Sequence, residues 1–172
     1  ISSLLMPKTR AYYEVWLDEE KLLEKSEDDP LYENRYLPRK FKIGIAIPPN
    51  NDVDVFTNDI GLIAIIENDQ LIGFNIAIGG GLSQTHGNPE TYPRLATVIG
   101  FTEGEEKTLK AIYEILTIQR DHGNRSDRKL ARLKYTVDKL GVDWYKTEIE
   151  KRTGFALEPA KPYSFSARKD LF

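Results

Sequence analysis

The chain has 172 residues, of which 40% are hydrophobic and 30% are charged, a composition typical of a folded globular protein and not of a disordered or fibrous one. Its 24 Lys and Arg residues against 27 Asp and Glu residues give a formal net charge of -3, which disfavours nucleic-acid binding by a broadly basic surface. Because the chain has no cysteine, it cannot by itself form a disulfide, a Cys-ligated zinc site or a Cys-held iron–sulfur cluster.

Membrane and leader segments are not indicated. No apolar run reaches the roughly 18 residues that a membrane-spanning helix needs. The chain opens on Ile1-Ser2-Ser3 without Met, and no charged-then-apolar signal pattern comes after it. His86 and His122 are too far apart for a zinc-binding HExxH pair. We therefore expect a piece of a longer cytoplasmic polypeptide, with no metal ligands of its own and neither a membrane nor a nucleic acid as partner.

The first 35 residues differ from the rest in composition. Residues 11–17 are aromatic and β-branched and predict a strand. Residues 18–33 hold eight acidic residues and two lysines, which is typical of a solvated helix end followed by a loop. Pro30 and Pro38 mark the passage into the more apolar part of the chain. We divide the chain into an N-terminal strand with an acidic linker, residues 1–35, and a main domain, residues 36–172.

Three strands are predicted next. Residues 41–47 alternate in polarity and stop at Pro48-Pro49. Two further apolar runs, residues 60–67 and 71–78, flank Asn68-Asp69, which predicts an antiparallel hairpin. The second of these runs leads into Gly79-Gly80-Gly81.

The second half of the chain has helical periodicity. Leu109, Ile112 and Leu116 share one helix face, and Gly123 is a suitable end for that helix. Ser126 is a candidate cap for a second helix that ends at Gly141, and a third is expected over residues 143–152 before Gly154. The apolar positions of the second helix are Leu130, Leu133, Val137 and Leu140. Strands first and helices later predict an α+β fold, a mixed, largely antiparallel sheet followed by packed helices.

The first candidate site is the Lys40-Phe41-Lys42 triplet. Residues two apart on a strand share a face, so Lys40 and Lys42 are expected to point the same way, beside the small residues Gly44 and Ala46. The opposite face, with Phe41, Ile43, Ile45 and Ile47, is expected to pack on the core. Two cations beside a nearly bare stretch of backbone would suit a flat anionic ligand. The simpler alternative is a solvated strand start with two surface lysines.

The second candidate is the basic segment 120–134, which holds six bases and two acids. Arg128 and Arg132 are four apart and are expected to share one helix face. Cations near a helix start oppose the helix dipole, so an anion would stabilise the cluster, and arginine suits carboxylates or phosphates. Two alternatives stay open: a solvated basic face paired with the acidic segment, and an RNA-binding helix, although aromatic residues are sparse here.

The third candidate is the Gly79-Gly80-Gly81 run, with His86 shortly after it. Consecutive glycines allow a ligand or another chain to approach the backbone closely. The run lacks a nucleotide-binding pattern, and a purely structural turn is the alternative. Residues 50–54 resemble a calcium loop only superficially, because the required Gly and final Glu are missing.

A series of short motifs occurs in one order along nearly the whole chain, and together they resemble the siroheme-containing sulfite and nitrite reductase family. These motifs are Thr9-Arg10-Ala11-Tyr12, Trp16-Leu17-Asp18, Tyr36-Leu37-Pro38-Arg39-Lys40-Phe41-Lys42, Pro48-Pro49-Asn50-Asn51-Asp52, Asn58-Asp59, Gly73-Phe74-Asn75, Gly79-Gly80-Gly81-Leu82, His86-Gly87-Asn88, Gln119-Arg120-Asp121, Gly123-Asn124-Arg125 and Asp127-Arg128-Lys129.

The resemblance implies an oxidoreductase that reduces sulfite to sulfide in sulfur assimilation and cysteine biosynthesis, using siroheme coupled to a [4Fe–4S] cluster. The family's two active-site lysines match Lys40 and Lys42, which would bind substrate and deliver protons. A siroheme-contacting arginine matches Arg39, and a family lysine that meets a siroheme carboxylate matches Arg132, a change that keeps the charge. The cofactor-binding residues so expected are Arg39, Lys40, Lys42, Gly80, Gly81, Arg128, Arg132 and Lys134.

The same resemblance limits what this chain does alone. It covers only the first of two siroheme- and cluster-binding halves, so the cluster cysteines and further active-site arginines would come from the remaining lobes of the same polypeptide. The isolated chain is therefore expected to be inactive. Lys42 favours sulfite, because asparagine stands there in the nitrite-reducing branch. Nitrite reduction and a non-catalytic ligand-binding module stay open, as does the electron donor, an NADPH-dependent flavoprotein or ferredoxin.

Overall fold

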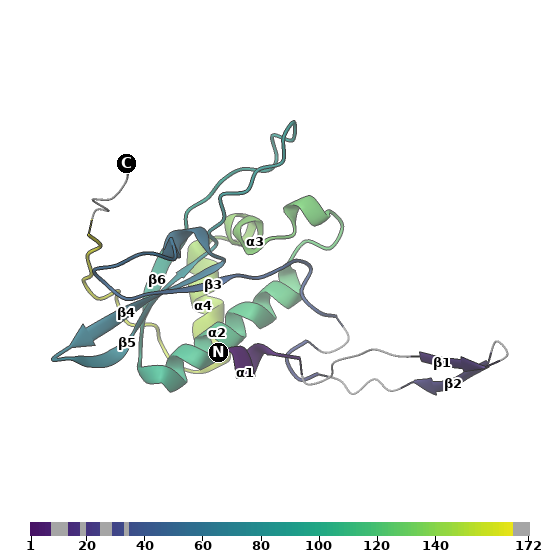
Figure 1. Ribbon diagram of the computed structural model, residues 1–172, viewed down its shortest axis with the longest axis horizontal. Coiled ribbons are helices and arrows are strands. Elements are labelled where there is room, and N and C mark those ends of the chain that lie inside the picture. Colours follow the sequence, from purple (N-terminus) through teal and green to yellow (C-terminus); the bar gives the residue numbers. More distant parts are fainter. Residues whose placement is uncertain (8–13, 18–19, 25–28, 33–34, 167–172) are drawn as a thin grey trace.

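The computed structural model describes residues 1–7, 14–17, 20–24, 29–32 and 35–166 (Figure 1). A short helix, α1 (Ser2–Leu5), is followed by the strands β1 (Glu14–Leu17) and β2 (Glu20–Glu24), which pair antiparallel. Figure 1 shows this hairpin standing away from the main body. The strand expected over residues 11–17 is confirmed for its described part, Glu14–Leu17. The helix end and loop expected over 18–33 is wrong at Glu20–Glu24, because acidic composition reports polarity and says nothing of whether a partner strand is available.

The main domain is built on a four-stranded mixed sheet. Its strands are β3 (Ile43–Ala46), β4 (Ile60–Glu67), β5 (Gln70–Ile78) and β6 (Thr97–Glu103), in the order β3-β4-β5-β6. β3 runs parallel to β4, and the other two pairs are antiparallel. The link between β3 and β4 contains a turn of 3-10 helix, η1 (Val55–Thr57).

The predicted hairpin of residues 60–78 is confirmed. Asn68 and Asp69 have φ angles of 52° and 61°, so both central residues of the turn are left-handed. This conformation matches the twist of two antiparallel strands, and Asn and Asp tolerate it better than other non-glycine residues.

Three α-helices come after the sheet: α2 (Gly104–His122), α3 (Leu133–Leu140) and α4 (Val142–Thr153). Gly123, Gly141 and Gly154 lie at their C-terminal ends, as predicted.

The cap assigned to Ser126 is wrong. Residues 128–130 form a separate 3-10 turn, η2 (Arg128–Leu130), and Arg132 precedes α3. The Asn124 side chain accepts hydrogen bonds from the N–H groups of Ser126 and Asp127, at 2.9 and 3.0 Å. These local bonds hold residues 124–127 in a turn, and no helix starts at Ser126.

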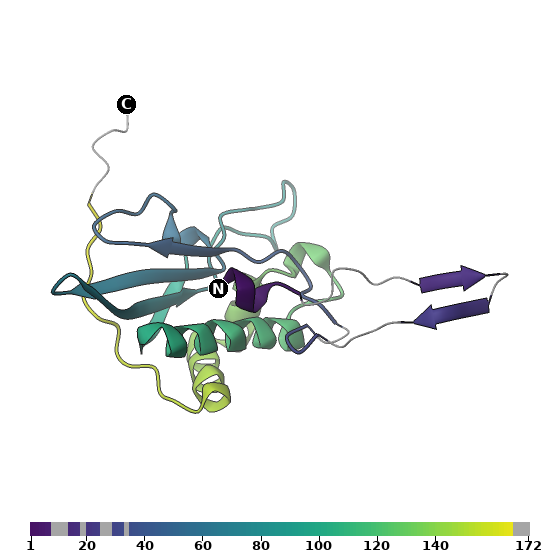
Figure 2. The same ribbon diagram turned by 60° about the horizontal axis from the view of Figure 1, so that its bottom comes forward.

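The helices cover one face of the sheet (Figures 1 and 2). The main core there contains Ile60, Leu62, Ile76 and Ile78 from the sheet and Ile112, Ile115, Ile118, Tyr145 and Ile149 from the helices, all 0% exposed. A smaller cluster on the other face joins Ala46, Val55 and Ile63 to Phe56, Val98 and Phe165. The predicted α+β class, with a mixed, largely antiparallel sheet and packed helices, is confirmed.

The N-terminal part contributes to the main core through Leu31 and Tyr32. The division at residue 35, which stays a prediction, therefore falls after residues that pack with the main domain. Within the described ranges, none of the helices combines the length and the apolar character needed to traverse a bilayer.

Candidate functional site

The small residues of β3 are covered, contrary to the sequence-based expectation. Gly44 and Ala46 are buried, and a Cβ atom on Gly44 would come within 2.5 Å of Asn58 Nδ2. Ile45 and Ile47, expected in the core, are 43% and 58% exposed. The face with the small residues is thus covered, because the segment containing η1 folds back over it. Ile43, on the opposite face, packs against the main core as expected, and that face becomes exposed only beyond it. Alternation within a strand shows that its faces differ and cannot show what covers each face.

Lys40 and Lys42 both have exposed side chains. Regular strand pairing starts one residue later, at Ile43. The Lys42 main chain is nevertheless held: its N–H donates to Asp59 Oδ2 at 2.9 Å, and its carbonyl accepts from the Ile60 N–H at 3.0 Å. The Lys42 ammonium group therefore extends into solvent from an anchored main chain, and the exposed Lys40 lies two residues before it.

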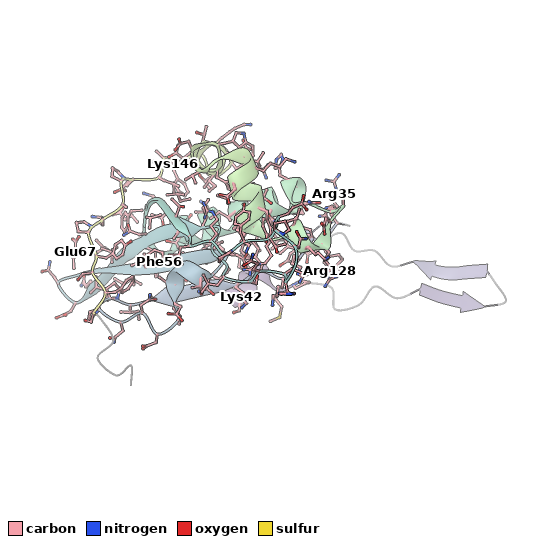
Figure 3. The ribbon with its side chains drawn as sticks, turned by 90° about the horizontal axis from the view of Figure 1, so that it is seen from above. Arg35, Lys42, Phe56, Glu67, Arg128 and Lys146 are labelled. Carbon is pink, nitrogen blue, oxygen red and sulfur yellow. The ribbon has the colours of Figure 1, made fainter. Side chains whose placement is uncertain are left out.

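Arg39 and Arg128 bring a second basic segment to the same part of the molecule. Arg39 Nη1 donates to the Arg128 carbonyl at 3.4 Å, and Figure 3 shows Lys42 and Arg128 on the same side of the domain. The Arg128 side chain is exposed, and so is Lys129. Arg128 and Arg132 do not share a helix face, because Arg128 lies in η2 and Arg132 lies before α3.

Arg132 is buried and its donors are used within the chain. The residue is 8% exposed. Its Nε and Nη2 donate to the two carboxylate oxygens of Asp59 at 3.2 and 2.8 Å, and Nη2 also reaches the Gly80 carbonyl at 3.3 Å. Burial raises the pKa of Asp59, while the hydrogen bonds and charge of Arg132 and the Lys42 amide act in the opposite direction.

Lys134 is also internal, at 0% exposed. Its Nζ donates to the carbonyls of Gly81, at 3.1 Å, Ser83, at 2.8 Å, and Tyr92. Burial, with the nearby charge of Arg132, lowers the pKa of this ammonium group. Lys134 therefore ties both ends of residues 81–92 together, and its donors are directed at the main chain of this protein.

The glycine run packs tightly, and its amides have partners inside the chain. The N–H groups of Gly79, Gly80 and Gly81 donate to the carbonyls of Asp59, Asn58 and Arg94 at 2.8, 3.0 and 2.8 Å. A Cβ atom on Gly80 would lie 2.2 Å from the Phe56 carbonyl oxygen, and one on Gly81 would lie 2.9 Å from Arg132 Nη1. Glycine is needed here for close internal packing, and the three amides do not form a free cradle for an anion.

Much of the rest of the basic segment 120–134 stabilises the fold. Arg120 Nη1 donates to the Leu31 carbonyl at 2.7 Å. Arg125 donates to the carbonyls of Arg35, Tyr36 and Arg120 at 3.1, 2.6 and 2.9 Å.

A cavity of about 720 Å³ lies beside this segment, between residues 122–126 and α3, and Arg125 and Lys139 are part of its lining. His86 is exposed and does not line it. Among the residues that the structure describes, no group of three or more His, Asp or Glu side chains could hold a metal ion.

Sequence reasoning missed Asp59 as part of this arrangement. It carries the carboxylate that meets both Lys42 and Arg132. It appeared only within a short motif, because a single acid before an apolar run has no local feature that distinguishes a buried carboxylate from an exposed one.

Comparisons with known proteins agree on one family. The model of the nitrite and sulphite reductase 4Fe-4S domain matches residues 1–157. Proteins named sulfite reductase [NADPH] hemoprotein beta-component are similar over the whole chain: the one from Leptospira biflexa is 66% identical and that from Staphylococcus saprophyticus 55%. This chain spans 31% and 30% of their lengths. The structure of the Mycobacterium tuberculosis NirA protein matches 74% of this chain and 22% of that one, with a TM-score of 0.60 and 26% identity.

Proposed function

Since this chain belongs to the nitrite and sulphite reductase 4Fe-4S domain family, we propose that it is part of a siroheme-dependent sulfite reductase that reduces sulfite to sulfide. The chain spans about a third of the length of the curated relatives that it matches. The remaining lobes of the same polypeptide therefore complete the site. They supply the [4Fe–4S] ligands, because this chain has no cysteine.

The observation that carries the proposal is how the cations are divided. Arg132 and Lys134 are buried and bonded within the chain. Lys40 and Lys42 stay exposed, with the main chain anchored at Lys42, and Arg39 brings Arg128 to the same region. Exposed cations gathered from two segments suit an anion with several negative charges.

Siroheme, with its many carboxylates, is such an anion, and these residues fit it. Arg39 and Arg128 would hold carboxylates at its rim, beside Lys40 and Lys42. Arg132, Lys134, Gly80 and Gly81 would act on the cofactor side mainly by fixing the backbone around residues 79–83. The bound cofactor would supply the iron that takes up sulfite and delivers electrons to it.

Lys40 and Lys42 would do the acid–base part of the reaction. An ammonium group attracts the sulfite dianion and orients its oxygens. As each S–O bond breaks, the departing oxygen needs protons, and a positioned ammonium can donate them and be reprotonated from water. Lys42 favours sulfite over nitrite, because a second cation matches the higher charge of sulfite.

The names of the relatives support the choice of substrate and of electron donor. They are sulfite reductase hemoprotein components whose names include NADPH, so we propose an NADPH-dependent flavoprotein as the electron donor. A nitrite reductase of the same family is the second candidate, because the family model that matches this chain covers nitrite as well as sulphite reductases.

Substitution of Lys40 in the full-length protein tests the proposal. Lys40→Ala is expected to keep the siroheme absorbance and to lose sulfite turnover by about 100-fold or more, the usual contribution of a positioned acid. Lys151→Ala, at a side chain 74% exposed on α4, is the matched control and should be fully active. Normal turnover by Lys40→Ala would remove Lys40 from the site. Siroheme binding without any turnover by the unaltered protein would favour the non-catalytic module.

A further inference from the structure

Asp59 is a fully buried carboxylate at the residue before β4. It is 0% exposed and has no access to a ligand of its own. A buried carboxylate is costly unless charges and hydrogen bonds compensate it, so its partners indicate what it does.

Those partners come from three segments that the proposed function brings to one site. Asp59 Oδ2 accepts from the Lys42 N–H at 2.9 Å and from Arg132 Nη2 at 2.8 Å. Its own carbonyl accepts from the Gly79 N–H at 2.8 Å. One residue therefore links the lysine triplet, the start of the glycine run and Arg132.

The hydrogen bond from the Lys42 N–H to Asp59 lies at the start of the pairing between β3 and β4. Ladder pairing between β3 and β4 starts at Ile43 and Ile60, and Lys42 lies just outside it. The amide of Lys42 is directed at the Asp59 side chain, while its carbonyl is held by the Ile60 amide. The main chain of Lys42 is thus held at two points, at its carbonyl by the Ile60 amide and at its amide by the Asp59 carboxylate.

We propose that Asp59 is a positioning residue, which fixes the main chain at Lys42 and thereby orients the Lys40 and Lys42 ammonium groups toward the anionic ligand. The inference rests on the proposed function, because it presumes that these two lysines act on the ligand. Asp59 acts through Lys42 and does not touch substrate or cofactor. A small displacement of a positioned group is enough to cost a large factor in rate.

The first test uses the full-length protein without any substitution. Hydrogen–deuterium exchange at single-residue resolution should find the Lys42 amide strongly protected, although it lies outside the strand ladder. Fast exchange at Lys42, comparable to that of a loop amide, would overturn the proposal whatever any variant does.

The second test uses Asp59→Asn in the full-length holoprotein, which removes the charge and keeps the shape. Loss of a charge-assisted hydrogen bond should accelerate exchange of the Lys42 amide by about tenfold or more. The KM for sulfite should rise by about tenfold or more, and the siroheme absorbance should be retained. If the variant does not fold or loses siroheme, the exchange measurement on the unaltered protein decides the question.

Asp121→Asn is the matched control. Asp121 also accepts from two arginines, from Arg120 at 2.8 Å and from Arg152 at 3.1 Å, but it lies on α2 and makes no bond to Lys42. The Asp121→Asn variant should have lower stability and an unchanged KM for sulfite. An equal rise of KM in both variants would indicate a general loss of stability and overturn the assignment.

Lys42→Ala separates failure of this inference from failure of the proposed function. If Lys42→Ala impairs sulfite reduction and Asp59→Asn does not change the KM, Asp59 is not a positioning residue and the proposed function stands. If both Lys42→Ala and Lys40→Ala keep full activity, the proposed function fails, and the positioning role fails with it.

Discussion

Lys134→Met offers a direct test of how the buried cations support the site. Lys134 is 0% exposed and its ammonium donates to three main-chain carbonyls, those of Gly81, Ser83 and Tyr92. Methionine has a similar length and fills much of the same space, so the substitution removes mainly the charge and its hydrogen bonds.

The expected cost is set by these contacts. Three charge-assisted hydrogen bonds at about 1.5 kcal/mol each amount to about 4.5 kcal/mol. Relief of the cost of burying an ammonium group returns roughly 1–2 kcal/mol of that. We therefore expect a loss of about 3 kcal/mol in the free energy of unfolding, or a fall in Tm of roughly 6–12 °C for a chain of this size.

The assay is urea denaturation followed by circular dichroism, with Lys139→Met as the matched control. Lys139 is an exposed lysine on the same helix, α3, and its substitution should change the free energy of unfolding by less than about 0.5 kcal/mol. Deuterium uptake by residues 81–92 should rise in Lys134→Met and not in the control. Equal stability of the two variants would refute the conclusion that Lys134 holds this loop through its carbonyls.

Three other outcomes are expected. Gly80→Ala should destabilise the fold by about 3 kcal/mol or more, because the new Cβ would lie 2.2 Å from the Phe56 carbonyl oxygen, which belongs to the main chain. Gly44→Ala should destabilise it less, because its Cβ would meet a side chain that can move. Thermal unfolding of both variants measures the difference. Burial opposes ionisation of Asp121, but hydrogen bonds from two arginines lower its pKa below the ordinary value. The contribution of Asp121 to stability is therefore present above about pH 4 and should be lost on further acidification. Acid unfolding should show this loss in the unaltered protein and not in Asp121→Asn. Burial and the neighbouring Asp138 carboxylate raise the pKa of Tyr92 to about 12, so its contribution to stability should decline as the pH rises from about 10 toward that value. Tyr92→Phe should make the alkaline decline in stability less steep without abolishing it, because other tyrosines also have raised pKa values.

Local chemistry determined much of the secondary structure. Asn68-Asp69 between two apolar runs specified a hairpin, because these residues tolerate the left-handed conformation that the turn requires. Helical periodicity together with Gly123, Gly141 and Gly154 located the helices and their C-terminal ends. Because these signals depend only on neighbours within a few residues, the sequence alone is enough to identify them.

Contacts between distant segments decided the rest. Which face of β3 is covered depends on residues 55–58 packing over Gly44 and Ala46, and strand periodicity treats both faces alike. The division of the cations into exposed Lys40 and Lys42 and buried Arg132 and Lys134 depends on partners such as Asp59, which is 73 residues from Arg132. A sequence reports the charge of a side chain, but only the packed structure determines whether that charge meets a carbonyl of its own chain or remains free for a ligand.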